Sequence, residues 1–482
     1  MKVSEIYNLN KSQYELDFID IDINKDTPLF LEPYILSKYE ANWTEDANSY
    51  IKSFFSHFIM LLRNEDVTEA RNLLTGLLIE PNETCLGLSR GTPHGKSLNV
   101  TDVNRIIDSV LSSDAITSGL VEDLEDFRVF IRNIGPDKLS DMTTNIIKRK
   151  LIEYTVDQCK LWGIDITPDI VTGIYWNREK CRWEESHAEM LVIDNRPIVL
   201  VPKNIVMFTD SYTPDVYKQH FLLNFLQLEH INEQSRLVKF RKDNTPYVTK
   251  KSIKEDFKDN NIKIDTEYLV DFTRKHRDVF TSFKQRTFSH AKLKDQSTLT
   301  DVKLDDVIVT LVSELQSTPS GKKDADKYHR IIAGILELLF FPHLSAPKVE
   351  FPIHDGRKRI DIKYDNTASQ GFLLNIWKSY GIPCTYVMVE CKNYSNDVGN
   401  PEVDQLSSRF NINRGKLGLL LCRTIENKNL LIKRCQDTFK DGRGLIIPLD
   451  DSDIIRMLNN FSDLNYTICN QVLMDKYKQI NT

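Results

Sequence analysis

The chain has 482 residues, of which 41% are hydrophobic and 27% are charged, and its formal net charge is −6. This length is too great for one ordinary core, so we expect two or three domains, and the composition excludes a largely disordered protein. The negative charge argues against polyanion binding over the whole surface, although residues 320–482 carry 23 basic against 19 acidic residues.

The sequence lacks the features of secreted and membrane proteins. The first residues, MKVSEIYNLNKSQ, contain no apolar segment of a signal peptide, and the strongly apolar run 331–341 is too short to span a bilayer. Eight cysteines occur without CxxC pairs, which is typical of reduced thiols. We therefore expect a cytoplasmic protein with no membrane partner.

The first 160 residues are predicted to be mainly helical. Apolar residues recur at helical spacing in four segments, 49–63, 67–79, 100–113 and 142–159. Residues 170–208 change to β-rich runs, with a hairpin turn at 194–197. The pattern predicts a helical domain at 1–160 and an α+β region at 161–319, followed by a C-terminal domain at 320–482.

Two segments of the middle region have a distinct character. Residues 216–234 have the spacing of a helix. The segment 236–258 is basic, and it is either a contact for nucleic acid or a solvent-facing surface beside an interdomain joint. We favour the second interpretation, because most charge runs face solvent.

The C-terminal domain is predicted to be α/β. Its elements in chain order are a helix at 325–341, a strand at 358–366, a helix at 372–381 and strands at 385–394 and 416–423. Glu337 interrupts the apolar sequence of the first helix. A carboxylate buried there is costly unless it has a partner or binds a metal.

Three charged residues of this domain are predicted to converge. Asp361 alternates with apolar neighbours on the first strand, and Glu390 and Lys392 share one face of the next strand. If these strands pair, two carboxylates and an ammonium group meet. Carboxylates and a backbone carbonyl are ligands for Mg²⁺, and an ammonium group can orient or deprotonate a water molecule. This set of groups points to phosphodiester hydrolysis.

The segments RIDIKYDN and VMVECKNY resemble the PD-(D/E)XK restriction-endonuclease-like superfamily. Ile360–Asp361 stands at the PD position, and Glu390-Cys391-Lys392 stands at the (D/E)XK position. The stretch VECKNYSNDVGNPEVDQLSSRF is most similar to Mrr-type and phage-defence nucleases. This resemblance implies an α/β/α core with a mixed central sheet, and Mg²⁺ or Mn²⁺ held by Asp361, Glu390 and the Cys391 carbonyl. It also implies that Glu337 and Gln405 complete the catalytic site.

Five basic residues lie near these motifs, and each is either a phosphate contact or ordinary surface charge. They are Arg357, Lys358, Arg359, Arg409 and Arg414.

We therefore expect a metal-dependent endonuclease that acts on nucleic acid, with double-stranded DNA as the favoured substrate. The resemblance implies a role in bacterial restriction or antiphage defence, with the N-terminal region as sensor or gate. Further partners would be a second copy of the chain or another defence protein. The alternatives are a nuclease-like module that binds or assembles without cutting, a ribonuclease, and a regulator that uses the segment 236–258.

Overall fold

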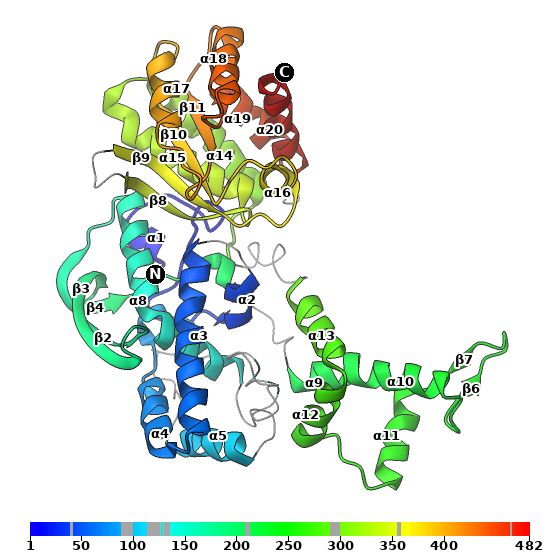
Figure 1. The fold of residues 1–482 in the computed structure, drawn as a ribbon. Helices are drawn as coiled ribbons and strands as arrows, with labels where there is room; N and C mark the ends of the chain where they lie inside the picture. Colours follow the sequence, from blue (N-terminus) through cyan, green and yellow to red (C-terminus); the bar gives the residue numbers. More distant parts are fainter. Residues whose placement is uncertain are drawn as a thin grey trace.

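The computed structural model of this chain describes residues 1–38, 42–87, 100–112, 126, 129, 135–207, 213–289, 299–353, 358–462 and 465–482. They form three parts in chain order, which we name the N-terminal body (residues 1–207), the arm (213–289) and the C-terminal unit (299–482) (Figure 1). The N-terminal body is largely helical and the C-terminal unit is α/β, so the predicted fold class is confirmed.

The helices of the N-terminal body include the long helix α8, which packs against α3. They are α1 (Val3–Ile6), α2 (Pro33–Lys38), α3 (Asn42–Arg63), α4 (Val67–Thr75), α5 (Val100–Ser112) and α8 (Pro136–Trp162). Helix α8 begins six residues before its predicted start, because Gly135 precedes it in an extended conformation and Pro136 is favourable in a first helical turn. None of the described helices has both the length and the apolar composition needed to cross a bilayer.

The strands of the N-terminal body form an antiparallel sheet and one short pair. The sheet consists of β2 (Thr167–Asn177), β3 (Arg182–Ile193) and β4 (Arg196–Ile198), and the pair consists of β1 (Phe30–Leu31) and β5 (Val206–Met207). The predicted hairpin is confirmed between β3 and β4. Its two turn residues, Asp194 and Asn195, both have positive φ, as a tight two-residue hairpin turn requires.

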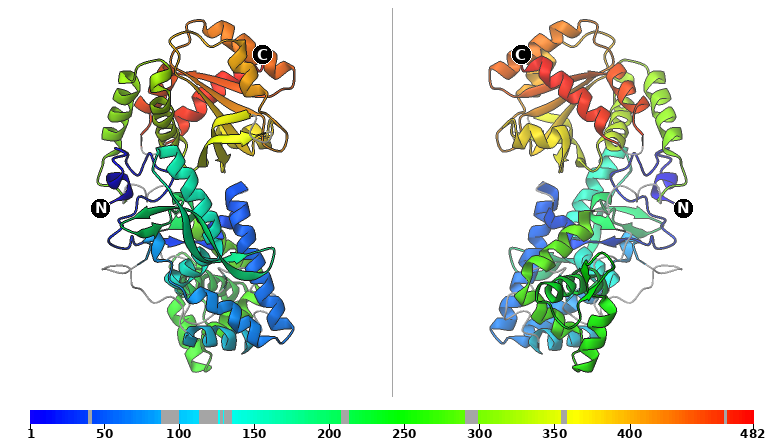
Figure 2. Two further views of the ribbon diagram at one scale, coloured as in Figure 1. Left: turned by 90° about the vertical axis from the view of Figure 1, so that its left-hand side faces the viewer. Right: turned by 90° about the vertical axis from the view of Figure 1, so that its right-hand side faces the viewer.

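The arm projects away from the other two parts in the view of Figure 1, and the side views of Figure 2 look along this direction, so the arm and the N-terminal body overlap there. Its elements are α9 (Pro214–Tyr217), a π-helical turn (Lys218–Leu222), α10 (Leu223–Asn232), β6 (Lys239–Phe240), β7 (Pro246–Tyr247), α11 (Lys250–Asp259), α12 (Thr266–Lys275) and α13 (Arg277–Ser289). The helix predicted at 216–234 is present, with a π-helical turn after its first turn. The hairpin of β6 and β7 lies at the outer end of the arm.

The C-terminal unit is built on a five-stranded sheet in the order β12-β11-β10-β9-β8. Strands β10, β11 and β12 are parallel and β8 and β9 are antiparallel to their neighbours, so the sheet is mixed, as predicted. The strands are β8 (Leu344–Ile353), β9 (Lys358–Asn366), β10 (Tyr386–Lys392), β11 (Leu417–Cys422) and β12 (Leu445–Asp450). The helices are α14 (Leu304–Ser317), α15 (Ala325–Phe340), α16 (Gly371–Lys378), α17 (Asn400–Ser407), α18 (Lys428–Lys440), α19 (Asp451–Asn459) and α20 (Thr467–Ile480).

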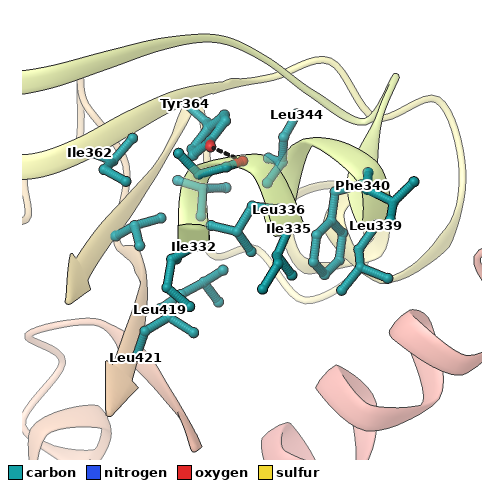
Figure 3. Packing of buried hydrophobic residues seen from close by; sticks show 14 of the residues in the cluster. Ile332, Ile335, Leu336, Leu339, Phe340, Leu344, Ile362, Tyr364, Leu419 and Leu421 are labelled. Atoms are coloured by element: carbon teal, nitrogen blue, oxygen red, sulfur yellow. Dashed lines mark hydrogen bonds between the residues drawn. The ribbon is translucent and has the colours of Figure 1, made fainter. Parts of the chain in front are cut away.

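Helices pack on both faces of this sheet. On one face, apolar residues of α15 meet Ile362, Leu419 and Leu421, and the Tyr364 hydroxyl donates to the Ala333 carbonyl at 3.3 Å (Figure 3). On the other face, α17 packs where Gly418 has no side chain, with Leu406 directly against it. The sheet therefore lies between two helical layers, and Glu390 lies on the α17 side because it pairs in register with Leu420, two residues from Gly418.

The hydrophobic core of the C-terminal unit extends into the N-terminal body. Tyr14, Leu16 and Phe18 from the start of the chain belong to the same buried cluster as Ile332 of α15 and Leu419 of β11. A second cluster fills the rest of the N-terminal body and the arm. The two ends of the chain thus share one core.

Candidate active site at the end of strand β10

The Asp361 carboxylate lies at the point where β9 and β10 separate. The ladder between these strands ends at the pair Val389–Ile362, and the next pair in this register would be Glu390 and Asp361. Instead, Asp361 Oδ2 accepts a hydrogen bond from the Cys391 backbone N–H at 3.0 Å. The side chain of Asp361 thereby takes the place of a ladder bond and lies next to Glu390, as the period-two pattern predicts.

Glu390 is fully buried and is held between two cations. Lys392 Nζ lies 2.7 Å from its Oε1, and the Arg409 guanidinium forms an ion pair with Oε2. Lys392 also donates to Gln405 Oε1 at 3.3 Å. A carboxylate with no exposed surface is stable in its ionised form only when it is paired, and this site supplies two partners.

The geometry of Arg409 differs from that of a surface phosphate contact. Its side chain is 6% exposed, and burial lowers the pKa of the guanidinium, an effect that the nearby Asp361 carboxylate opposes. Arg409 lies just after α17, the helix that carries Gln405. The turn that follows α17 therefore supplies the second buried cation for Glu390.

The histidine of α15 contacts this site, a feature that the sequence pattern did not single out. His329 Nε2 lies 3.4 Å from the Cys391 carbonyl oxygen, which is the predicted backbone ligand for a metal. The segment before α15 is fixed beside it, because the Asn393 side chain donates to the carbonyls of Pro319 and Gly321. The sequence feature that could have identified His329 is its position two residues before the apolar run that starts at Ile331.

Glu337 is not part of this cluster. It lies eight residues after His329 on α15, which is about 12 Å along a helix. Its carboxylate lies 3.0 Å from Lys203 Nζ, and both side chains are 2% exposed. On the same line of α15, Arg330 donates to the Leu161 carbonyl at 3.2 Å. This side of α15 therefore meets the N-terminal body, and Lys203 is the partner that the buried glutamate requires.

A second carboxylate lies beside this buried ion pair. Asp17 accepts hydrogen bonds from the Tyr154 hydroxyl at 2.7 Å and from the Ala346 N–H at 3.1 Å. Burial raises the pKa of Asp17 well above its ordinary value, and the neighbouring Glu337 raises it further. Burial also raises the pKa of Glu337, although Lys203 opposes the shift.

The remaining predicted phosphate contacts are placed only in part. Arg357 lies outside the described residues, and Lys358 and Arg359 form the start of β9, paired with Ile353 and Pro352. Arg414 donates to the Arg409 carbonyl at 3.2 Å, so it supports the turn that carries Arg409. Their role as phosphate contacts stays a prediction.

The oxygen atoms of the candidate site are of the kind that bind a hard divalent cation. Within the described ranges no three side chains of His, Cys, Asp or Glu are gathered as a metal site. The candidate site instead combines two carboxylates with one backbone carbonyl, all oxygen donors of the kind that Mg²⁺ prefers. Oδ1 of Asp361 has no hydrogen-bond partner among the described residues, whereas both oxygens of Glu390 are engaged by cations. A metal at Glu390 therefore requires one of these cations to move.

A cleft lies between the N-terminal body and the C-terminal unit, and none of the residues of the Asp361–Glu390–Lys392 cluster lines it. It has a volume of about 880 Å³, and its walls include Trp43 of α3 and Tyr386 of β10. Lys363 and Asp365 also line it, and they alternate along β9 on the face of Asp361. More acidic than basic side chains line this cleft, which makes it a poor channel for a polyanion.

The comparisons with known proteins concern the N-terminal body alone. A family model described as a domain of unknown function (DUF8370) matches residues 8–213. No curated protein and no solved structure matches the chain. The chain is thus similar over residues 8–213 to a family of unknown function, and the candidate site lies outside the matched range.

Proposed function

We propose that this protein is a metal-dependent endonuclease that hydrolyses phosphodiester bonds in DNA at the cluster of Asp361, Glu390 and Lys392. The observation that carries the proposal is the convergence of these side chains where β9 and β10 separate. Asp361 accepts from the Cys391 N–H at 3.0 Å, and Lys392 lies 2.7 Å from the adjacent Glu390 carboxylate. Two carboxylates can hold a metal ion and an ammonium group can transfer or hold a proton, which are roles that metal-assisted phosphodiester hydrolysis uses.

Asp361, Glu390 and the Cys391 carbonyl are the groups that would hold Mg²⁺ or Mn²⁺. The bound ion would supply Lewis-acid stabilisation of the reacting phosphoryl group and would lower the pKa of a water molecule. Asp361 is the more accessible of the two carboxylates, since it is partly exposed and Glu390 is fully buried. Asp361 would therefore receive the ion first.

Lys392 is the group in this chain best suited to act on the attacking water. Its ammonium group is fixed from two sides, by Glu390 and by the exposed side chain of Gln405. A held ammonium group can donate to the developing negative charge on the phosphoryl oxygens and can orient the water. Gln405 has a positioning role in this account, because it acts through Lys392.

The test is a nicking assay on supercoiled plasmid with Mg²⁺ or Mn²⁺, in parallel with EDTA. We expect cleavage only with metal, and we expect Asp361→Asn and Lys392→Gln each to reduce the rate on the order of 10²- to 10³-fold. The matched control is Asp404→Asn on α17, because Asp404 is exposed and pairs with Arg443. If Asp361→Asn cuts as fast as the control, the assignment is wrong.

The ion pairs of Glu390 favour a second candidate function. A site in which Lys392 and Arg409 permanently neutralise Glu390 would hold nucleic acid without cutting it. The same plasmid assay decides, because a binding module shifts the plasmid in a gel and leaves it supercoiled. A nuclease that prefers RNA is distinguished by parallel incubation with single-stranded RNA, since a site for the phosphate does not select the sugar.

The proposed biological role follows from the resemblance of residues 325–450 to restriction and phage-defence nucleases. Under this proposal the enzyme acts in bacterial restriction or antiphage defence, and the N-terminal body senses the trigger. The shared core supports this coupling, because Tyr14 and Phe18 pack in the same cluster as Ile332 of α15.

A further inference from the structure

The arm carries a hollow whose charged lining residues are all lysines. It has a volume of about 640 Å³ and lies between the π-helical turn, α11 and the loop after α11. Four lysines line it, and none of the residues that line it, all of them described, is acidic. The lysines are Lys218, Lys254, Lys258 and Lys263.

Two of these lysines donate hydrogen bonds within the arm, and the other two form no ion pair with a described residue. Lys218 donates to the Ile264 carbonyl at 3.0 Å, and Lys254 donates to Gln219 Oε1 at 3.1 Å. Lys258 and Lys263 are exposed, and neither forms an ion pair with a described residue. Two positive charges are therefore left for a ligand at the rim of the hollow.

Two of the lysines that line the hollow lie on α11. Lys254 and Lys258 stand one helical turn apart, and like charges at this spacing destabilise a helix. Of the three acidic residues of α11, Asp256 pairs with Arg236, Glu255 lies 3.8 Å from Lys251, and Asp259 forms no ion pair with a described residue. Lys258 forms no ion pair with a described residue, so an anion in the hollow would reduce the repulsion between these lysines.

The β6–β7 hairpin at the outer end of the arm carries a second group of cations. Phe240 is 67% exposed between Lys239 and Arg241, both of which are exposed as well. An exposed aromatic ring between cations is suited to stack on a nucleic-acid base while the cations contact phosphates. A single small anion would occupy the hollow alone, whereas a polyanion would use both features.

We propose that the arm binds the phosphodiester backbone of nucleic acid, with phosphates in the lysine-lined hollow and Phe240 stacked on a base. This site is separate from the Asp361–Glu390–Lys392 cluster and does not depend on cleavage. It would hold the substrate on one part of the molecule while another part acts on it.

The test is binding of a fluorescent duplex oligonucleotide with single-stranded ends to the full-length chain in EDTA, over a series of salt concentrations. We expect Lys258→Gln/Lys263→Gln to weaken binding about tenfold and to lower the slope of log K against log salt by about 2. The matched control is Lys251→Gln/Lys275→Gln, which removes the same charge from exposed positions of the arm outside the hollow. The four substituted lysines are all exposed, so the circular dichroism spectra of both double variants should match that of the wild type.

Three outcomes would overturn the proposal. The first is equal weakening by the hollow pair and the control pair, which would indicate only net charge. The second is that both double variants bind the oligonucleotide as tightly as the wild type. The third is that the Lys258→Gln/Lys263→Gln variant no longer binds ATP or inorganic phosphate but still binds the duplex. The occupant of the hollow would then be a small phosphorylated compound. Because no cleavage is measured, these outcomes are independent of the proposed nuclease activity.

Discussion

Glu390 is the residue whose environment most constrains the chemistry of the candidate site. It has no exposed surface, and its two oxygens are shared between Lys392 and Arg409. Removal of one partner from a buried ion pair leaves an uncompensated charge in a medium of low polarity. The stability of the C-terminal unit should therefore depend on Arg409 as well as on its apolar core.

We predict that Arg409→Met lowers the free energy of unfolding by about 3–5 kcal/mol. Arg409→Lys should cost clearly less, because it keeps the positive charge. The measurement is urea denaturation followed by tryptophan fluorescence and circular dichroism. Arg443→Met is the control, because Arg443 is 41% exposed and an exposed ion pair contributes only about 0–1 kcal/mol. Equal losses for Arg409→Met and Arg443→Met would contradict the buried pair.

The sequence predicted the site residues unequally well. Strand periodicity predicted correctly that Asp361, Glu390 and Lys392 share one location, because alternation fixes the face of a strand. It did not predict the position of Glu337, because helical spacing shows that a residue is buried and does not show which part of the protein covers it. The buried role of Arg409 was also not predictable, since an arginine has the same chemistry at a surface and in an ion pair.

At the scale of elements, α15 serves two regions of the molecule. Its first turns place His329 at the Cys391 carbonyl, and its later turns place Glu337 at Lys203 of the N-terminal body. Helix α8 has a comparable division, because its last turns reach the C-terminal unit, where Gln158 donates to the Pro347 carbonyl at 3.2 Å. Its first turns carry a buried acid, Asp141, whose pKa is raised.

The Asp141 carboxyl group predicts a pH dependence of stability. Burial raises its pKa to about 8, and the carboxylates of Asp137, Glu80 and Asp26 add to the shift. In the unfolded chain the pKa is about 4, so the folded state holds a proton that the unfolded state releases. Stability contributed by this group is therefore fully present below about pH 4 and is lost as pH rises to about 8.

We predict that Asp141→Asn flattens this dependence. The variant should unfold at the same temperature as the wild type at acidic pH and at a higher temperature above pH 8, as measured by calorimetry across a pH series. Asp157→Asn, on the same helix, is the control because Asp157 is partly exposed and pairs with Lys348 at 2.9 Å. Parallel pH curves for the wild type and Asp141→Asn would argue against a raised pKa.

Two strands of the central sheet were not recognised in the sequence, each for a physical reason. Strand β12 contains Pro448, which normally argues against a strand, but β12 is at the edge of the sheet, where a missing N–H is tolerated. Strand β8 contains Pro347 and has Ala346 in a left-handed conformation, and its register with β9 shifts there. The alternation that marks a regular strand is thus interrupted in β8.

At the scale of the whole molecule, the N-terminal body and the C-terminal unit are joined by a polar junction inside a shared core. Lys203 and Glu337 form its buried ion pair, and Asp17 and Tyr154 complete it. Two carboxylates share one lysine, and burial raises the pKa of both. The junction therefore depends on the Lys203 ammonium group.

We predict that Lys203→Met lowers the free energy of unfolding by about 3–5 kcal/mol, since it leaves two buried carboxylates without a cation. Lys160→Met on α8 is the control, because Lys160 is exposed. Thermal unfolding measures the effect. If both variants unfold at the same temperature as the wild type, the N-terminal body and the C-terminal unit do not depend on this ion pair for their association.

The proposed activity requires that Asp361 and Glu390 together hold one divalent cation, which calorimetric titration with Mn²⁺ measures. We expect one bound Mn²⁺ per chain in the wild type and in Asp404→Asn, and roughly tenfold weaker binding in Asp361→Asn, which has lost one anionic ligand. Equal Mn²⁺ binding in all three proteins would show that Asp361 is not a metal ligand.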